Sequence, residues 1–188
     1  MMPSILEIPE VRQRVSTLTV EEYHQLGEFN ENGRRTELIR GIVIEKMSKS
    51  PLHRTVVTLL YRILLAQLPH GFTVWQDQPM TFTDSEPEPD ISVTRGSERD
   101  FIHAHPETAE FVVEVAVSSV ALDRENASLY AEAGVKEYWI VLGGQRQVEV
   151  YRQPKNGRYQ DKQTFGAGDE IECGSVPGVR IRLADLFV

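Results

Sequence analysis

Two apolar runs dominate the hydrophobic pattern of the chain, at residues 111–117, which are apolar except for one acidic residue, and at residues 138–142. Continuous Val-rich runs of this length are typical of strands that are covered on both faces, as in the sheet of an α/β protein. Between them we predict a helix over residues 121–133, which Gly134 ends. Strand, helix and strand in this order form a βαβ-like unit, so we expect the two strands to be parallel neighbours.

The first half of the chain alternates short helical and strand patterns. A helix is predicted to start at Thr19, which can cap it together with Glu22. Residues 36–47 indicate a strand pair with a turn at residues 40–41, and a longer helix opens at residues 50–51, where proline suits the first turn. Further short strands are expected at residues 72–76, 80–82, 89–93, 148–152, 159–164 and 179–183, the last three antiparallel.

These elements predict a mixed α/β fold, with a central sheet flanked by helices and antiparallel strands at the C-terminal end. Residues 1–17 lack periodicity and are expected to form an N-terminal arm. A chain of 188 residues is most simply a single domain, so we assign residues 18–188 to it.

Composition excludes several classes of protein. No apolar stretch approaches the roughly 20 residues of a membrane span, and the N-terminus has no basic-then-apolar signal pattern. Cys173 is the single cysteine, which excludes an internal disulfide and a cysteine-based zinc site. We therefore expect a cytoplasmic protein.

The formal net charge of −8 argues mildly against an avid nucleic-acid binder, because phosphate contacts need a basic surface.

One acidic residue, Glu114, lies in the middle of the first apolar run. A buried carboxylate without a partner costs several kcal/mol, so a cation or a hydrogen-bond donor must satisfy it. Asp90, at the start of another short apolar strand, gives a second carboxylate. Carboxylates on neighbouring strands can hold a divalent metal ion, and a structural ion pair is the alternative.

Several stretches resemble a family of restriction-endonuclease-like proteins, long a domain of unknown function (Uma-type), within the PD-(D/E)XK nuclease superfamily. The resemblance covers roughly residues 18–187. The matching stretches are ELIRG at 37–41, His53, EPEPDI at 86–91, EV at 114–115 with SS at 118–119, Asp123, Tyr130, AGV at 133–135 and EYWIV at 137–141.

The resemblance implies a Mg²⁺ or Mn²⁺ site built from Asp90, Glu114 and the main-chain carbonyl of Val115, with DNA as the substrate. Glu37 is a candidate acid that supports these ligands, or a surface carboxylate near an arginine. Such a site would polarise a phosphodiester and activate the attacking water. The resemblance also implies a homo-oligomer, a dimer above all, because superfamily members often work as dimers.

This chain departs from the family pattern at the lysine that accompanies the metal ion. In the superfamily this lysine lies two residues after the strand carboxylate, where this chain has Ala116, and in the family it lies four residues before Tyr130, where this chain has Asn126. Asparagine can orient a water but supplies no charge. Arg124, Lys46 and Lys136 are the candidate replacements. Arg124 lies two residues before Asn126, about 200° around the helix, so we expect it to face elsewhere.

Other histidines have ordinary explanations. His53 could approach a phosphate, but a polar residue near a helix start is more often a capping or surface contact. His103 and His105 alternate like metal ligands, yet they lie in a polar segment and make an incomplete site.

Three interpretations stay open at this point. The chain is a metal-dependent endonuclease with Asn126 in place of the lysine, an inactive nuclease fold that binds nucleic acid or protein, or an oligomeric structural protein.

Overall fold

The computed structural model describes residues 8–28, 35–117 and 120–187. The chain divides into two compact units. The smaller unit comprises residues 1–46 and 83–86, and the larger unit comprises residues 47–82 and 87–188.

The smaller unit carries a capped helix and a hairpin. Its elements are α1 (Pro9–Arg12), α2 (Val20–Glu28), β1 (Thr36–Ile39) and β2 (Ile42–Glu45). Thr19 Oγ1 accepts a hydrogen bond from Glu22 N at 3.2 Å, and Glu22 Oε2 accepts one from Thr19 N at 2.8 Å. This reciprocal pair is the predicted capping box. The predicted turn between β1 and β2 is also confirmed, with Arg40 and Gly41 at φ values of 52° and 73°.

The larger unit is built on a mixed sheet of six strands in the order β3-β4-β5-β6-β7-β8. β5 and β6 run parallel, as the βαβ pattern predicts, and the other neighbouring pairs are antiparallel. Its elements are α3 (Pro51–Gln67), β3 (Phe72–Gln76), β4 (Ile91–Arg95), β5 (Phe111–Ala116), α4 (Val120–Glu132), β6 (Glu137–Leu142), β7 (Gln147–Lys155), β8 (Arg158–Gly166), β9 (Glu170–Glu172) and β10 (Arg180–Arg182), with short 3₁₀ turns at Glu98–Phe101 and Leu183–Asp185.

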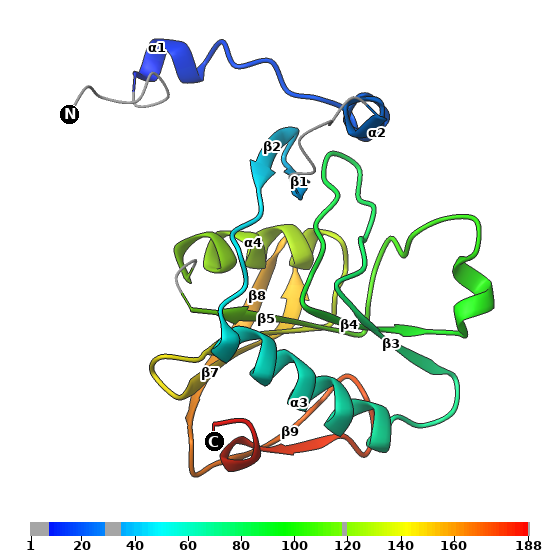
Figure 1. The fold of residues 1–188 in the computed structure, drawn as a ribbon, viewed down its shortest axis with the longest axis vertical. Coiled ribbons are helices and arrows are strands. Elements are labelled where there is room, and N and C mark those ends of the chain that lie inside the picture. Colours follow the sequence, from blue (N-terminus) through cyan, green and yellow to red (C-terminus); the bar gives the residue numbers. More distant parts are fainter. Residues whose placement is uncertain (1–7, 29–34, 118–119, 188) are drawn as a thin grey trace. The chain divides into compact units, whose positions relative to one another are not determined.

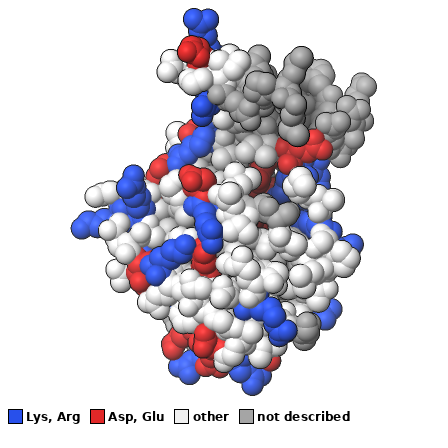
Figure 2. Space-filling view, turned by 90° about the vertical axis from the view of Figure 1, so that its left-hand side faces the viewer, with Lys and Arg blue, Asp and Glu red and all other residues white. Residues whose placement is uncertain are grey.

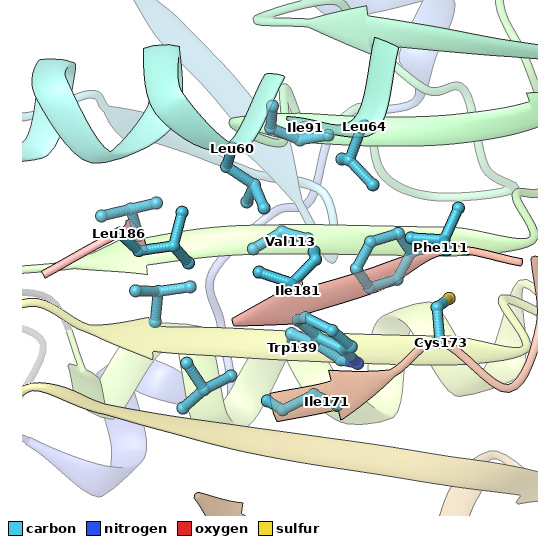
Figure 3. Packing of buried hydrophobic residues seen from close by; sticks show 14 of the residues in the cluster. Leu60, Leu64, Ile91, Phe111, Val113, Trp139, Ile171, Cys173, Ile181 and Leu186 are labelled. Carbon is cyan, nitrogen blue, oxygen red and sulfur yellow. The ribbon is translucent and has the colours of Figure 1, made fainter. Parts of the chain in front are cut away.

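The two faces of this sheet are covered by different elements (Figure 1). Because side chains alternate along a strand, Phe111, Val113 and Val115 of β5 face one side, and Val112 and Ala116 face the other. The first set packs with α3 and with the antiparallel pair β9–β10. Figure 3 shows this core, in which Leu60 and Leu64, Trp139, Ile171 and Ile181 converge. The second set packs under α4, so both helices fix the position of β5.

One predicted strand is wrong. Residues 80–82 lie outside every strand. The amides of Met80 and Thr81 donate to the carbonyls of Pro87 and Pro106, at 2.9 and 3.0 Å. Proline has no N–H to return, so a strand ladder cannot extend through these contacts. β4 likewise begins two residues later than predicted, at Ile91, after Pro89.

No helix in the described part of the chain combines the length and the apolar character that crossing a membrane requires. The mixed α/β architecture predicted from the sequence is confirmed. The predicted boundary between an arm and a single domain after residue 17 stays a prediction.

The packing of α3 on the sheet predicts how leucine substitutions in this helix change the free energy of unfolding. Leu60 is fully buried between α3 and the sheet, whereas Leu65 on the same helix is 58% exposed. We expect Leu60→Ala to lower the free energy of unfolding by about 2–5 kcal/mol, because it leaves a cavity in the core. Leu65→Ala should change it by no more than about 0.5 kcal/mol. Urea denaturation of the two variants checks this, and equal losses would contradict the packing described here.

Candidate functional site

The register of two neighbouring strands brings the two predicted carboxylates together. Ile91 of β4 pairs with Val113 of β5 in the antiparallel ladder, so the next residues outward, Asp90 and Glu114, lie opposite each other. Asp90 N donates a hydrogen bond to Glu114 Oε2 at 3.2 Å, and Val115 N donates one to Asp90 Oδ2 at 2.8 Å. The three residues proposed as metal ligands therefore form one connected group, the Asp90 site.

Asp90 is buried, with only 5% of its surface exposed, and a lysine and a histidine contact its carboxylate. Lys49 Nζ lies 2.8 Å from Oδ1, and His53 Nε2 lies 2.9 Å from Oδ2. Burial by itself would raise the pKa of Asp90, but the hydrogen bonds and charges of His53 and Lys49 lower it below its ordinary value. Asp90 is consequently an ionised carboxylate at neutral pH.

Lys49 comes from the segment between β2 and α3 and bridges two carboxylates. Besides Asp90, its ammonium contacts Asp77 Oδ1. Burial lowers the pKa of Lys49, but Asp90 and Asp77 more than offset this and raise it overall. Asp77 adopts a left-handed backbone conformation at φ 53°, and its amide donates to the carbonyl of Asp90 at 3.3 Å. Lys49 and Asp77 were not among the residues that the sequence singled out.

His53 contributes to the site from the first turn of α3. Ser50 caps this helix by accepting a hydrogen bond from His53 N at 3.2 Å. An ionised carboxylate only accepts hydrogen bonds, so His53 Nε2 carries the hydrogen in its contact with Asp90. The other ring nitrogen, Nδ1, is buried without a hydrogen-bond partner among the described residues. His53 is thus a helix-start residue whose ring belongs to the site.

Glu114 is held from the opposite face of the sheet, by α4. Tyr130, which is fully buried, donates its hydroxyl to Glu114 Oε1 at 2.9 Å. Asn126 lies one helical turn before Tyr130 and is also buried, so both residues lie on the covered face of α4. The position at which the resemblance implies a lysine therefore holds an uncharged side chain on the helix that contacts Glu114.

Comparisons with known proteins identify the family and the fold. Residues 20–184 match the Uma2 family, which is described as "Putative restriction endonuclease". The chain belongs to this family. A solved structure, a putative nuclease of DUF820 from Anabaena variabilis, superposes with a TM-score of 0.77 over 90% of this chain and 97% of that chain, at 19% identity. That likeness confirms the nuclease-like fold. No curated protein matches the chain.

The three cations weighed as replacements for the family lysine are engaged elsewhere. Arg124 of this Uma2 member pairs with Glu149, its Nε lying 3.1 Å from Oε2. Lys136 pairs with Glu110 at 2.8 Å. Within the smaller unit, Lys46 lies 3.7 Å from Glu37, the fourth residue of the predicted catalytic set. Glu37 is therefore a half-buried carboxylate with a lysine beside it, and its supporting role stays a prediction.

The donor chemistry at Asp90 and Glu114 suits a hard divalent cation, because Mg²⁺ and Mn²⁺ prefer carboxylate and carbonyl oxygens. Among the described residues, no three His, Cys, Asp or Glu side chains are grouped in the manner of a metal centre. A metal ion at this site would take its third protein ligand from the main chain, as the resemblance implies for Val115. It would also have to displace the Lys49 ammonium or the His53 ring from Asp90.

The pairing of Glu149 predicts how stability depends on pH. Burial alone would raise the pKa of Glu149, but hydrogen bonds from Arg124, Tyr151 and Lys162 lower it from 4.5 to about 2. Between these values the unfolded chain binds a proton that the folded chain does not, so stability is lost as the pH falls from about 4.5 to 2. Over this pH range the urea midpoint of Glu149→Gln should fall less steeply than that of the wild type. Equal slopes for the variant and the wild type would show that Glu149 is not the source of this loss of stability.

Proposed function

We propose that this chain is a divalent-metal-dependent endonuclease that hydrolyses phosphodiester bonds in DNA. The observation that carries the proposal is the direct contact between Asp90 and the Glu114–Val115 segment, across two neighbouring strands of a nuclease-like sheet. Membership of a family described as "Putative restriction endonuclease" supports the reaction class. In this proposal Mg²⁺ or Mn²⁺ is held by Asp90, Glu114 and the carbonyl of Val115.

The metal ion, when bound, would polarise the phosphate and lower the pKa of the attacking water. The remaining work falls to side chains of this chain. Tyr130 fixes one oxygen of Glu114, and the amide of Val115 fixes one oxygen of Asp90, so both carboxylates are oriented by groups that are themselves buried. Asn126, on the same face of α4 as Tyr130, is proposed to orient the water.

An inactive nuclease fold that binds nucleic acid or a protein is the second candidate. It is favoured by the uncharged residues at Ala116 and Asn126, and by an Asp90 whose oxygens are already bound by Lys49 and His53. Figure 2 shows Lys and Arg interspersed with Asp and Glu on one face, rather than gathered by sign. A homodimer and a cytoplasmic location stay predictions.

Cleavage of supercoiled and single-stranded DNA in Mn²⁺ and in Mg²⁺ tests the proposal. We expect nicking by the wild type that disappears when the metal is chelated. Glu114→Gln should lower the rate by more than about 100-fold, since even residues that only support metal ligands contribute about 10–100-fold. Glu107→Gln, the same change at an exposed acid, should cleave like the wild type.

Two results would contradict the proposal. The first is a wild-type protein that cleaves neither substrate in either metal, which favours the binding candidate. The second is cleavage that survives in both Glu114→Gln and Asp90→Asn, because the activity would then come from another site or from a contaminant. Titration of Mn²⁺ into the DNA-free proteins gives an independent readout, with binding expected for the wild type and lost in Glu114→Gln.

A further inference from the structure

A positive charge lies at the Asp90 site, although both sequence positions implied for it are uncharged. Lys49 Nζ is 2.8 Å from Asp90 Oδ1. It reaches the site from the segment before α3, whereas Ala116 is the last residue of β5 and Asn126 lies on α4. The charge at this site thus comes from a third part of the chain.

The hydrogen bonds of Lys49 leave room for a ligand. An ammonium group has three N–H donors. Its described partners, Asp77 and Asp90, use two of them. The side chain is neither sealed in nor on the open surface, with 20% of it exposed. One donor of a fixed, partly exposed cation therefore remains for an incoming anion.

The surroundings of Lys49 fix its position. The amide of Asp77 donates to the carbonyl of Asp90, so the two residues that hold the ammonium are also linked through their backbones. A cation held in this way already lies near the position at which negative charge would develop, even if a metal ion displaces it from Asp90. A lysine on an exposed loop, by contrast, would lose side-chain entropy on binding.

We propose that Lys49 is the residue that binds the scissile phosphate in this chain, in the role that the family assigns to a lysine on β5 or α4. The inference rests on the proposed function. In the reaction, the oxygen of water bonds to phosphorus, one phosphorus–oxygen ester bond breaks, and a proton from the water ends on the leaving oxygen. Lys49 keeps its protons throughout and donates a hydrogen bond to a non-bridging oxygen, where negative charge grows.

Lys49→Met tests the role, with Lys136→Met as its matched control. Lys136 is also a lysine that pairs with a buried carboxylate, Glu110. Under single-turnover conditions in Mn²⁺, we expect Lys49→Met to cleave about 100–1000-fold more slowly, the usual effect of removing one preorganised donor. Its affinity for DNA in Ca²⁺ should fall by less than about tenfold, because one phosphate contact is a small share of binding. Lys136→Met should match the wild type in both measurements.

A second variant separates a chemical role from a structural one. Adding Asn126→Lys to Lys49→Met returns a positive charge to the position that the family uses. We expect this double variant to recover at least about tenfold in cleavage rate, and Lys49→Arg to retain more activity than Lys49→Met. A residue that merely bridges Asp77 and Asp90 would not be replaced by a charge on α4.

The outcomes distinguish the two proposals. If the wild type cleaves and Lys49→Met cleaves equally fast, the role of Lys49 is overturned and the endonuclease stands. If Lys49→Met loses cleavage together with its thermal stability, and Asn126→Lys restores neither, Lys49 is structural and the inference fails again. If the wild type is inactive in both metals, the endonuclease and the role of Lys49 fall together.

Discussion

The burial of the Asp90 carboxylate is the constraint on which the site depends. An ionised carboxylate that is 5% exposed is tolerated only if several donors replace the water that it has lost. Asp90 obtains them from the strand beside it, through Val115, from the start of α3, through His53, and from the segment before α3, through Lys49. The position of α3, set by its packing on the sheet, is thereby linked to the electrostatics of the site.

The resemblance implied that Asp90 and Glu114 belong to one site, and the pairing of Ile91 with Val113 places them opposite each other. Val113 packs in the core on the α3 side of the sheet, so Glu114 faces the other side, under α4. Helix geometry predicted that Arg124, two residues before Asn126 on α4, would face away from the site, and it pairs with Glu149. The positions of residues on helices and strands can therefore be predicted from the periodicity of the sequence.

The positions of residues in the segments between helices and strands cannot be predicted in this way. Lys49 and Asp77 lie outside every helix and strand, and nothing in their local sequence indicates that their side chains meet at Asp90. The one available signal was indirect, since a buried acid requires a cation somewhere. The predicted strand at residues 80–82 failed for a related reason, because the partners of its amides are prolines distant in sequence. Long-range contacts between loops are settled by the folded structure alone.

Lys49 is subject to two opposing demands. Without a metal ion, its charge offsets Asp77 and Asp90 and stabilises the folded site. With a divalent cation on Asp90, the same ammonium would be repelled and would have to leave Oδ1, so it weakens the affinity of the site for metal. The charge of Lys49 therefore allows Asp90 to stay buried as an ionised carboxylate, and the same charge opposes a second cation on that carboxylate.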